Sequence, residues 1–278
     1  MGLFTVNDWG PGNGQRETGS ARFNELIRRD FGRFFLANLF TVAGFLPFAS
    51  GCVYAILSKS ILVLIISALA GGAIAGPFLS GMADCIFRSL RDAPGGFFQN
   101  WKKAMRQNLK SSVLPGMILC LFTGIYLFMG VMIFYWASRL PGCGTIAIYF
   151  FGMLIMVMFF SVFWPQTVLF SLPLSRQIRN TLLFIAKYLW RVIGVSLLLM
   201  AYAAVMLLLL PWTLLVVPFA GFWFILLAVN FILYKNFNEA FEIEKKIAEQ
   251  FPEQAPFNET DEEWLKRKAE ESKKAPLE

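Results

Sequence analysis

Residues 60–83, SILVLIISALAGGAIAGPFLSGMA, form a run of 24 residues without a charged side chain. An α-helix rises 1.5 Å per residue, so about 20 apolar residues cross the hydrocarbon core of a bilayer. This run is therefore long enough to be a transmembrane helix. A soluble helix of the same length needs a polar face, which the run lacks.

The rest of the chain has the same character. Of its 278 residues 57% are apolar, only 15% are charged and none is histidine, whereas soluble domains carry roughly 25% charged residues. Further uncharged runs cover 34–58, 111–138, 140–175 and 192–234, and the last is long enough for two spans on either side of Pro211. The sequence therefore predicts an all-α polytopic transmembrane bundle. Its six expected spans are 34–57, 60–87, 112–136, 145–171, 190–210 and 213–234.

The positions of the 25 Lys and Arg residues predict the orientation. Basic residues are frequent before the first span, in the loops 88–110 and 172–189 and in the tail, whereas the intervening turns carry at most one, such as Lys59 or Arg139. The positive-inside rule then places both termini in the cytoplasm. We expect a cytoplasmic segment 1–33, a membrane domain 34–234 and a charged cytoplasmic tail 235–278. The net charge of +7 is accounted for by this topology, so nucleic-acid binding is not expected.

The loop 88–110 predicts an amphipathic basic helix. Its apolar residues recur at helical spacing over 97–110, and basic and amide side chains fill the other face. Such a helix lies in the membrane interface as a topology anchor with its cations among anionic headgroups, or it docks a partner. A similar pattern occurs over 21–35. The candidate docking residues are Arg88, Arg91, Trp101, Lys102, Lys103, Arg106, Asn108 and Lys110.

Small residues recur every four positions along the second span. Ala68, Gly72, Gly76 and Ser80 share one face, and Pro77 removes a backbone donor beside it. A stripe of this kind lets another helix approach closely. It predicts tight packing within the chain, and self-association into a homo-oligomer or a hinge at Pro77 are the alternatives.

Polar groups within the spans are few. Asp84 is the only acid that the sequence places in or beside a span, and Arg88 follows it at i+4, so we expect a local ion pair. A proton or cation coupling role for Asp84 is the alternative. The uncharged polar side chains are expected to bridge helices by hydrogen bonds, or to line a path for a neutral solute. They are Asn38, Thr41, Thr123, Ser161, Gln166 and Asn230.

Enzymatic chemistry has little support in the sequence. The chain has no histidine, its four cysteines are scattered, and no glycine-rich phosphate loop is present. The usual spacings of a zinc site or a catalytic triad are therefore absent. We expect a protein without a catalytic site, cofactor or metal. Cys52 and Cys143 both lie toward the predicted outer face, where a disulfide between them is possible.

Several motifs of the first half resemble the YesL-like family of bacterial membrane proteins. These are MGLF, WGPGNG, RRDFGRFFLANLF, LPF, AGPFLSGM, IFRSLRD and FFQNWKKAMRQNLKSS, within residues 1–135. The matching signature positions are Asn38, Gly76, Pro77, Gly81, Arg88, Asn108 and Lys110. The chain departs from the family pattern at Leu109, where an aromatic residue is usual, and at Asn100 and Trp101, where Asp and Phe are expected.

The resemblance implies a place in the bacterial cytoplasmic membrane and an association with carbohydrate uptake systems. It leads to the expectation of a non-enzymatic accessory or regulatory subunit that contacts sugar ABC permease subunits and anionic membrane lipids. The alternative is an autonomous transporter or channel for a small neutral solute.

Overall fold

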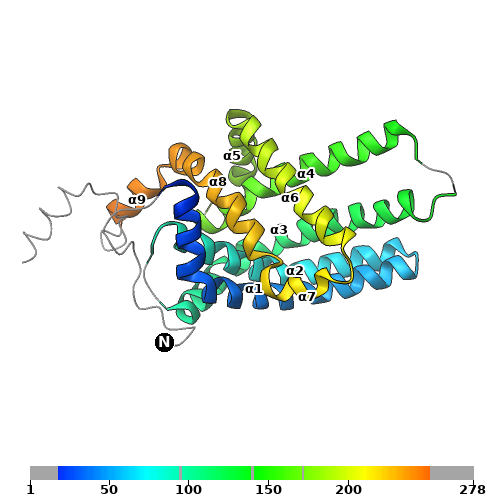
Figure 1. The fold of residues 1–278 in the computed structure, drawn as a ribbon, viewed down its shortest axis with the longest axis horizontal. Coiled ribbons are helices and arrows are strands. Elements are labelled where there is room, and N and C mark those ends of the chain that lie inside the picture. The colour runs from blue at the N-terminus through cyan, green and yellow to red at the C-terminus, as the bar shows by residue number, and fades with distance from the viewer. Residues whose placement is uncertain (1–17, 94–95, 139–140, 171, 251–278) are drawn as a thin grey trace, which may run out of the picture.

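The computed structural model describes residues 18–93, 96–138, 141–170 and 172–250 of the chain. Within these residues the regular secondary structure consists of helices alone (Figure 1). They are α1 (Gly19–Leu57), α2 (Ile61–Leu90), α3 (Phe97–Phe134), α4 (Cys143–Leu169), α5 (Leu174–Lys187), α6 (Leu189–Leu208), α7 (Thr213–Ala220), α8 (Trp223–Phe241) and α9 (Ile243–Gln250). The predicted all-α bundle is confirmed.

Five helices, namely α1, α2, α3, α4 and α6, are long and apolar enough to cross a membrane. Helices α7 and α8 make a sixth span only when taken together, and they meet at a bend of 54°. The sequence predicted one continuous helix over 213–234, and the structure differs in this respect. The start of α1 and helix α9 lie at the same end of the bundle, on the left in Figure 1. We call it the charged end, because it contains the charged residues of 22–33 and 84–92.

Helix α2 packs most extensively against α1 and α3. Two adjacent glycines make this possible. A Cβ on Gly71 would lie 2.5 Å from the Cα of Phe48 in α1, and a Cβ on Gly72 would lie 2.6 Å from the carbonyl oxygen of Gly116 in α3. The three helices therefore approach backbone to backbone on both sides of α2, as small residues allow in membrane proteins.

The second half of the chain builds its own core from α4, α5, α6 and α8. Its centre includes Val162, Val195 and Val229, and the rings of Phe184 and Phe237 stack with centroids 4.5 Å apart. Helix α2 joins the two halves, because its residues pack with Trp164 of α4 and with Leu227 of α8.

Helix α5 is polar on its inner side and apolar on its outer side. Gln177 and Thr181 are buried, whereas Leu182 and Leu183 are more than half exposed. Both contact α4, since Thr167 Oγ1 donates to Gln177 Oε1 at 3.4 Å and Gln166 Nε2 donates to Thr181 Oγ1 at 3.0 Å. Exposed leucines opposite buried polar side chains are typical of a helix that faces lipid. This arrangement supports an integral membrane protein independently of the length of the spans.

The two predicted interfacial helices, 21–35 and 97–110, are the first parts of the long helices α1 and α3. Part of their apolar face packs on protein and not on lipid. Phe34 stacks on Trp223 with centroids 5.5 Å apart, and Trp101 covers Gly81, where a Cβ would meet the indole at 2.8 Å. The reason is local: a glycine on α2 leaves a flat space that the ring of Trp101 fills. Phe98 remains exposed.

Candidate functional site

A buried cluster of ion pairs joins α1 to the last turn of α2 at the charged end. The carboxylate of Asp30 is only 1% exposed and accepts four hydrogen bonds from three side chains, two of them from Arg29. The donors include Arg29 Nη2 at 2.9 Å, Arg33 Nη1 at 3.2 Å and the hydroxyl of Ser89 at 2.6 Å. Two of these groups come from α1 and one comes from α2, so Asp30 fixes the two helices to each other.

Asp92, directly after α2, is the second buried carboxylate of this ion-pair cluster. It accepts from Arg22 Nη2 at 2.6 Å and also from Arg29, while Glu25 accepts from Arg22 Nη1 at 2.8 Å. Three guanidinium groups, counting Arg33, thus face three carboxylates, and the ion-pair cluster is formally neutral. Buried charges are tolerated only when they are paired in this way. The cluster therefore acts as a rigid joint between the start of α1 and the α2–α3 turn.

This ion-pair cluster was not predicted from the sequence. The prediction that Asp84 is the only acid in or beside a span is wrong, because Asp30 lies within α1 and Asp92 directly follows α2, both buried. The feature of the sequence that points to the cluster is the helical spacing of residues along α1. Arg22, Leu26 and Arg33 recur on the side of α1 that continues into the buried residues Ala37 and Thr41.

The expected ion pair between Asp84 and Arg88 is present, with Nε of Arg88 2.7 Å from Oδ2 of Asp84. Arg91 lies close by, and its Nε donates to the Phe87 carbonyl at 3.2 Å. Burial lowers the pKa of Arg91 below its ordinary value. No carboxylate among the described residues pairs with Arg91 within 4.0 Å. The other buried or half-buried arginines of the charged end each have a carboxylate partner among the described residues. Arg91 therefore adds one positive charge beside the Asp84–Arg88 pair.

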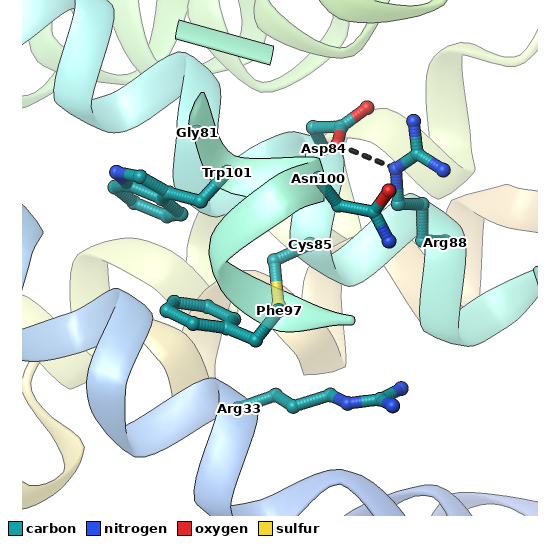
Figure 2. A pocket seen from close by; sticks show the side chains of 8 residues that line it. All are labelled: Arg33, Gly81, Asp84, Cys85, Arg88, Phe97, Asn100 and Trp101. Atoms are coloured by element: carbon teal, nitrogen blue, oxygen red, sulfur yellow. Dashed lines mark hydrogen bonds and ion pairs between the residues drawn. The ribbon is translucent and has the colours of Figure 1, made fainter. Parts of the chain in front are cut away.

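A pocket lies between α1, α2 and the first turns of α3, and we call it the α3 pocket. It is a shallow pocket that is open on one side, with a cavity volume of about 20 Å³. Figure 2 shows Asn100 reaching from α3 toward Arg88, with Arg33 entering from α1. The full lining is Arg33, Gly81, Asp84, Cys85, Arg88, Phe97, Asn100 and Trp101. The pocket thus combines guanidinium groups with aromatic walls.

The residues predicted to dock a lipid or a partner divide into two groups. Arg88 and Trp101 face the α3 pocket, and Asn108 is half-buried, with its carbonyl accepting from Ser112 at 2.6 Å. The others on α3 point outward and are exposed, and none of them forms an ion pair with a described residue. They are Lys102, Lys103, Arg106 and Lys110. The structure thus separates an inward site from an outward basic face, which we define by these four residues.

The small-residue stripe of α2 is covered by α3. Ala68, Gly72, Gly76, Pro77 and Ser80 are all buried. A Cβ on Gly76 would clash with the carbonyl oxygen of Ser112, and the return contact from Gly116 would lie 2.6 Å from the Cα of Gly76. The stripe is therefore occupied within the chain, which leaves it unavailable for self-association.

Replacing Gly76 by leucine is expected to lower the free energy of unfolding by about 2–3 kcal/mol, because overpacking at a backbone contact forces α2 and α3 apart. Thermal unfolding in a mild detergent measures the effect. Gly194→Leu is the matched control, because no atom lies within 4 Å of a Cβ built on this glycine. Equal unfolding temperatures for the two variants would contradict the contact between α2 and α3.

Asn38 bridges the break between α7 and α8. Its Nδ2 donates to the carbonyl oxygens of Val217 at 2.9 Å and Pro218 at 2.7 Å, and its Oδ1 accepts from the backbone N–H of Phe222 at 2.8 Å and of Trp223 at 3.3 Å. A helix break frees backbone groups that cannot be left unpaired in a membrane. One fully buried side chain from α1 satisfies them. The expected role in bridging helices is confirmed for Asn38 and, between α4 and α5, for Gln166.

The cysteines form no disulfide in the described part of the chain. Cys52 is buried in α1, where it packs in one cluster with Cys120, while Cys143 is exposed, and all are free thiols. The suggested pair of Cys52 and Cys143 is therefore absent. Among the described residues, no three His, Cys, Asp or Glu side chains gather where they might hold a metal ion.

Comparison of the chain with protein-family models, with curated proteins and with solved structures finds no match.

Proposed function

We propose that this integral membrane protein is a non-enzymatic accessory or regulatory subunit that contacts sugar permease subunits through the outward basic face of α3. The observation that carries the proposal is the contrast between two sets of cations. Arg22, Arg29 and Arg33 are held in ion pairs, whereas the four cations of the basic face are exposed and unpaired among the described residues.

The basic face lies on a firmly held helix. Trp101 fills the space over Gly81, and its ring also packs on Phe40 with centroids 5.5 Å apart. Cations on a rigid helix favour an acidic partner surface, because little conformational freedom of the backbone is lost on binding. The link to carbohydrate uptake comes from the resemblance of residues 1–135 to the YesL-like family.

An autonomous transporter or channel for a small neutral solute is the second candidate. It is favoured by buried polar atoms that make no hydrogen bond with described residues, since such atoms normally have a partner. Five belong to four helices and the sixth, Tyr188 Oη, lies between α5 and α6; the five are Ser80 Oγ, Trp164 Nε1, Gln166 Oε1, Ser196 Oγ and Asn230 Oδ1. The broken helix α7–α8 also resembles the discontinuous helices of transporters, although Asn38 already satisfies its backbone groups.

Gentle solubilisation of native membranes, capture by a C-terminal tag and mass spectrometry test the proposal. We expect stoichiometric recovery of sugar permease subunits. Charge reversal at Lys102, Lys103 and Arg106 to Glu is expected to lower that recovery at least about tenfold, since several complementary charges are replaced by repulsive ones.

The matched control reverses Arg176 and Arg179, which are exposed on α5 at a distance from the basic face in the sequence. Its recovery of permease subunits is expected to equal that of the unchanged protein. Recovery of the protein alone would argue against the accessory role. Flux of a neutral sugar into liposomes that contain only this protein would then support the transporter.

A further inference from the structure

The α3 pocket contains hydrogen-bond donors that have no acceptor. Nε of Arg88 is used by Asp84, but its two Nη atoms make no hydrogen bond to a described residue. The side-chain amide of Asn100 also has no partner among these residues, although its side chain is half-buried. Neither side chain is fully buried, so these donors can be reached from outside the protein. The pocket therefore offers a guanidinium edge and an amide to a ligand oxygen.

The charge of the pocket favours an anion. Arg33 and Arg88 line it and each already has a carboxylate partner, Asp30 and Asp84 respectively. Arg91 adds a further positive charge beside the carboxylate of Asp84. A planar guanidinium with two free Nη atoms matches the geometry of two phosphate oxygens.

The walls of the pocket favour an anion that carries an apolar portion. Phe97 and Trp101 pack on each other with centroids 5.6 Å apart and form one side of the pocket. Next to them, Phe98 is 63% exposed on the outside of α3. The pocket lies where α2 ends and α3 begins, at the level expected for the membrane interface. Phosphate groups of lipids occupy this depth, with glycerol and acyl carbons directly below.

We propose that the α3 pocket binds the phosphate group of an anionic membrane phospholipid. The Nη atoms of Arg88 and the amide of Asn100 donate to the phosphate oxygens, Arg91 supplies the positive charge that has no carboxylate partner among the described residues, and Phe97 and Trp101 contact the glycerol and the first acyl carbons. The site is separate from the outward basic face and does not depend on the proposed partner.

Native mass spectrometry of the full chain in neutral detergent, titrated with phosphatidylglycerol, measures this binding directly. Asn100→Leu removes the amide donors, and the double variant Asp84→Asn, Arg88→Gln replaces the ion pair by neutral groups of similar shape with the net charge unchanged. We expect the apparent Kd to rise at least about tenfold in each, since hydrogen bonds to charged groups are lost. The unfolding temperature without lipid shows that each variant is folded. Asn100→Leu is expected to keep it, because that amide has no partner to lose.

The matched control, Lys102→Gln with Lys103→Gln, removes two exposed cations from the same helix and is expected to leave the apparent Kd within twofold. Equal weakening in the control would overturn the proposal, because binding would then follow surface charge. Unchanged affinity in both pocket variants would overturn it as well. Displacement of the lipid by inorganic phosphate at millimolar concentration would overturn the lipid as the source and assign the pocket to a soluble phosphate.

Discussion

Replacing Asn38 by leucine is expected to lower the free energy of unfolding by about 3 kcal/mol or more. Three of the backbone groups that Asn38 pairs have no other partner among the described residues: the carbonyl of Pro218 and the N–H groups of Phe222 and Trp223. Each buried polar group left unpaired costs about 1–3 kcal/mol. The cost does not fall in a bilayer, where water is not available as a substitute.

Thermal unfolding of the detergent-purified protein measures this effect, and Asn24→Leu is the control. Asn24 lies on the same helix but is exposed, so its replacement is expected to change stability by less than about 0.5 kcal/mol. Asn38→Asp keeps the acceptor oxygen and loses the N–H donors. With a neutral carboxyl group, the free energy of unfolding is expected to lie between those of the unchanged protein and Asn38→Leu. With a charged carboxylate, the loss is expected to be larger. Unfolding of Asn38→Leu at the temperature of the unchanged protein would show that the α7–α8 break is not held by this side chain.

Replacing Asp30 by alanine is expected to have the other large effect and to lower the free energy of unfolding by about 3–5 kcal/mol. The neutral ion-pair cluster becomes positive by one charge, and that charge is buried. A second change, Arg33→Met, restores neutrality and is expected to recover part of the loss, so the two effects are not additive.

The control for Asp30 is Glu239→Ala. Glu239 pairs with Lys187 at 3.5 Å, but both side chains are more than half exposed, and exposed pairs contribute 0–1 kcal/mol. Chemical or thermal unfolding of the variants in one detergent compares the two pairs directly. If both replacements had the same small effect, the charged end would be open to solvent and not a rigid joint.

The spans were predictable because a bilayer demands a single property, an uncharged run of sufficient length, and that property is local in the sequence. Residues 61–83 of this run lie within one helix, and Gly72 and Gly76 predicted a face that another helix approaches. The boundaries of α1 and α3 were not predictable in this way. Helical turns that contain charged residues extend both helices beyond the apolar runs. In the sequence, the change from basic to apolar composition at these places resembles the end of a helix.

The helical spacing of Arg22, Leu26 and Arg33 marks one side of α1, but the partners in the ion-pair cluster and at the helix break could not be read from the sequence, because they are distant in the chain. Arg22 and Asp92 are 70 residues apart, and Asn38 is 179 residues from Val217. Nothing near Asp92 predicts that an arginine of another helix will reach it. The basic character of 21–35 was visible, but the same residues suit a headgroup anchor and a set of buried pairs. Only the three-dimensional packing separates these two uses.

The joint between Asp30, Asp92 and the arginines of α1 has a consequence for biogenesis. At the ribosome, α1 emerges before its partner at position 92, so until then Arg22 and Arg29 have only the carboxylates of α1 itself, those of Glu25 and Asp30, as partners among the described residues. The first hairpin of the protein thus closes from the cytoplasmic side under the predicted topology, after α2 is complete. The ion-pair cluster is thus complete only after Asp92 has been synthesised.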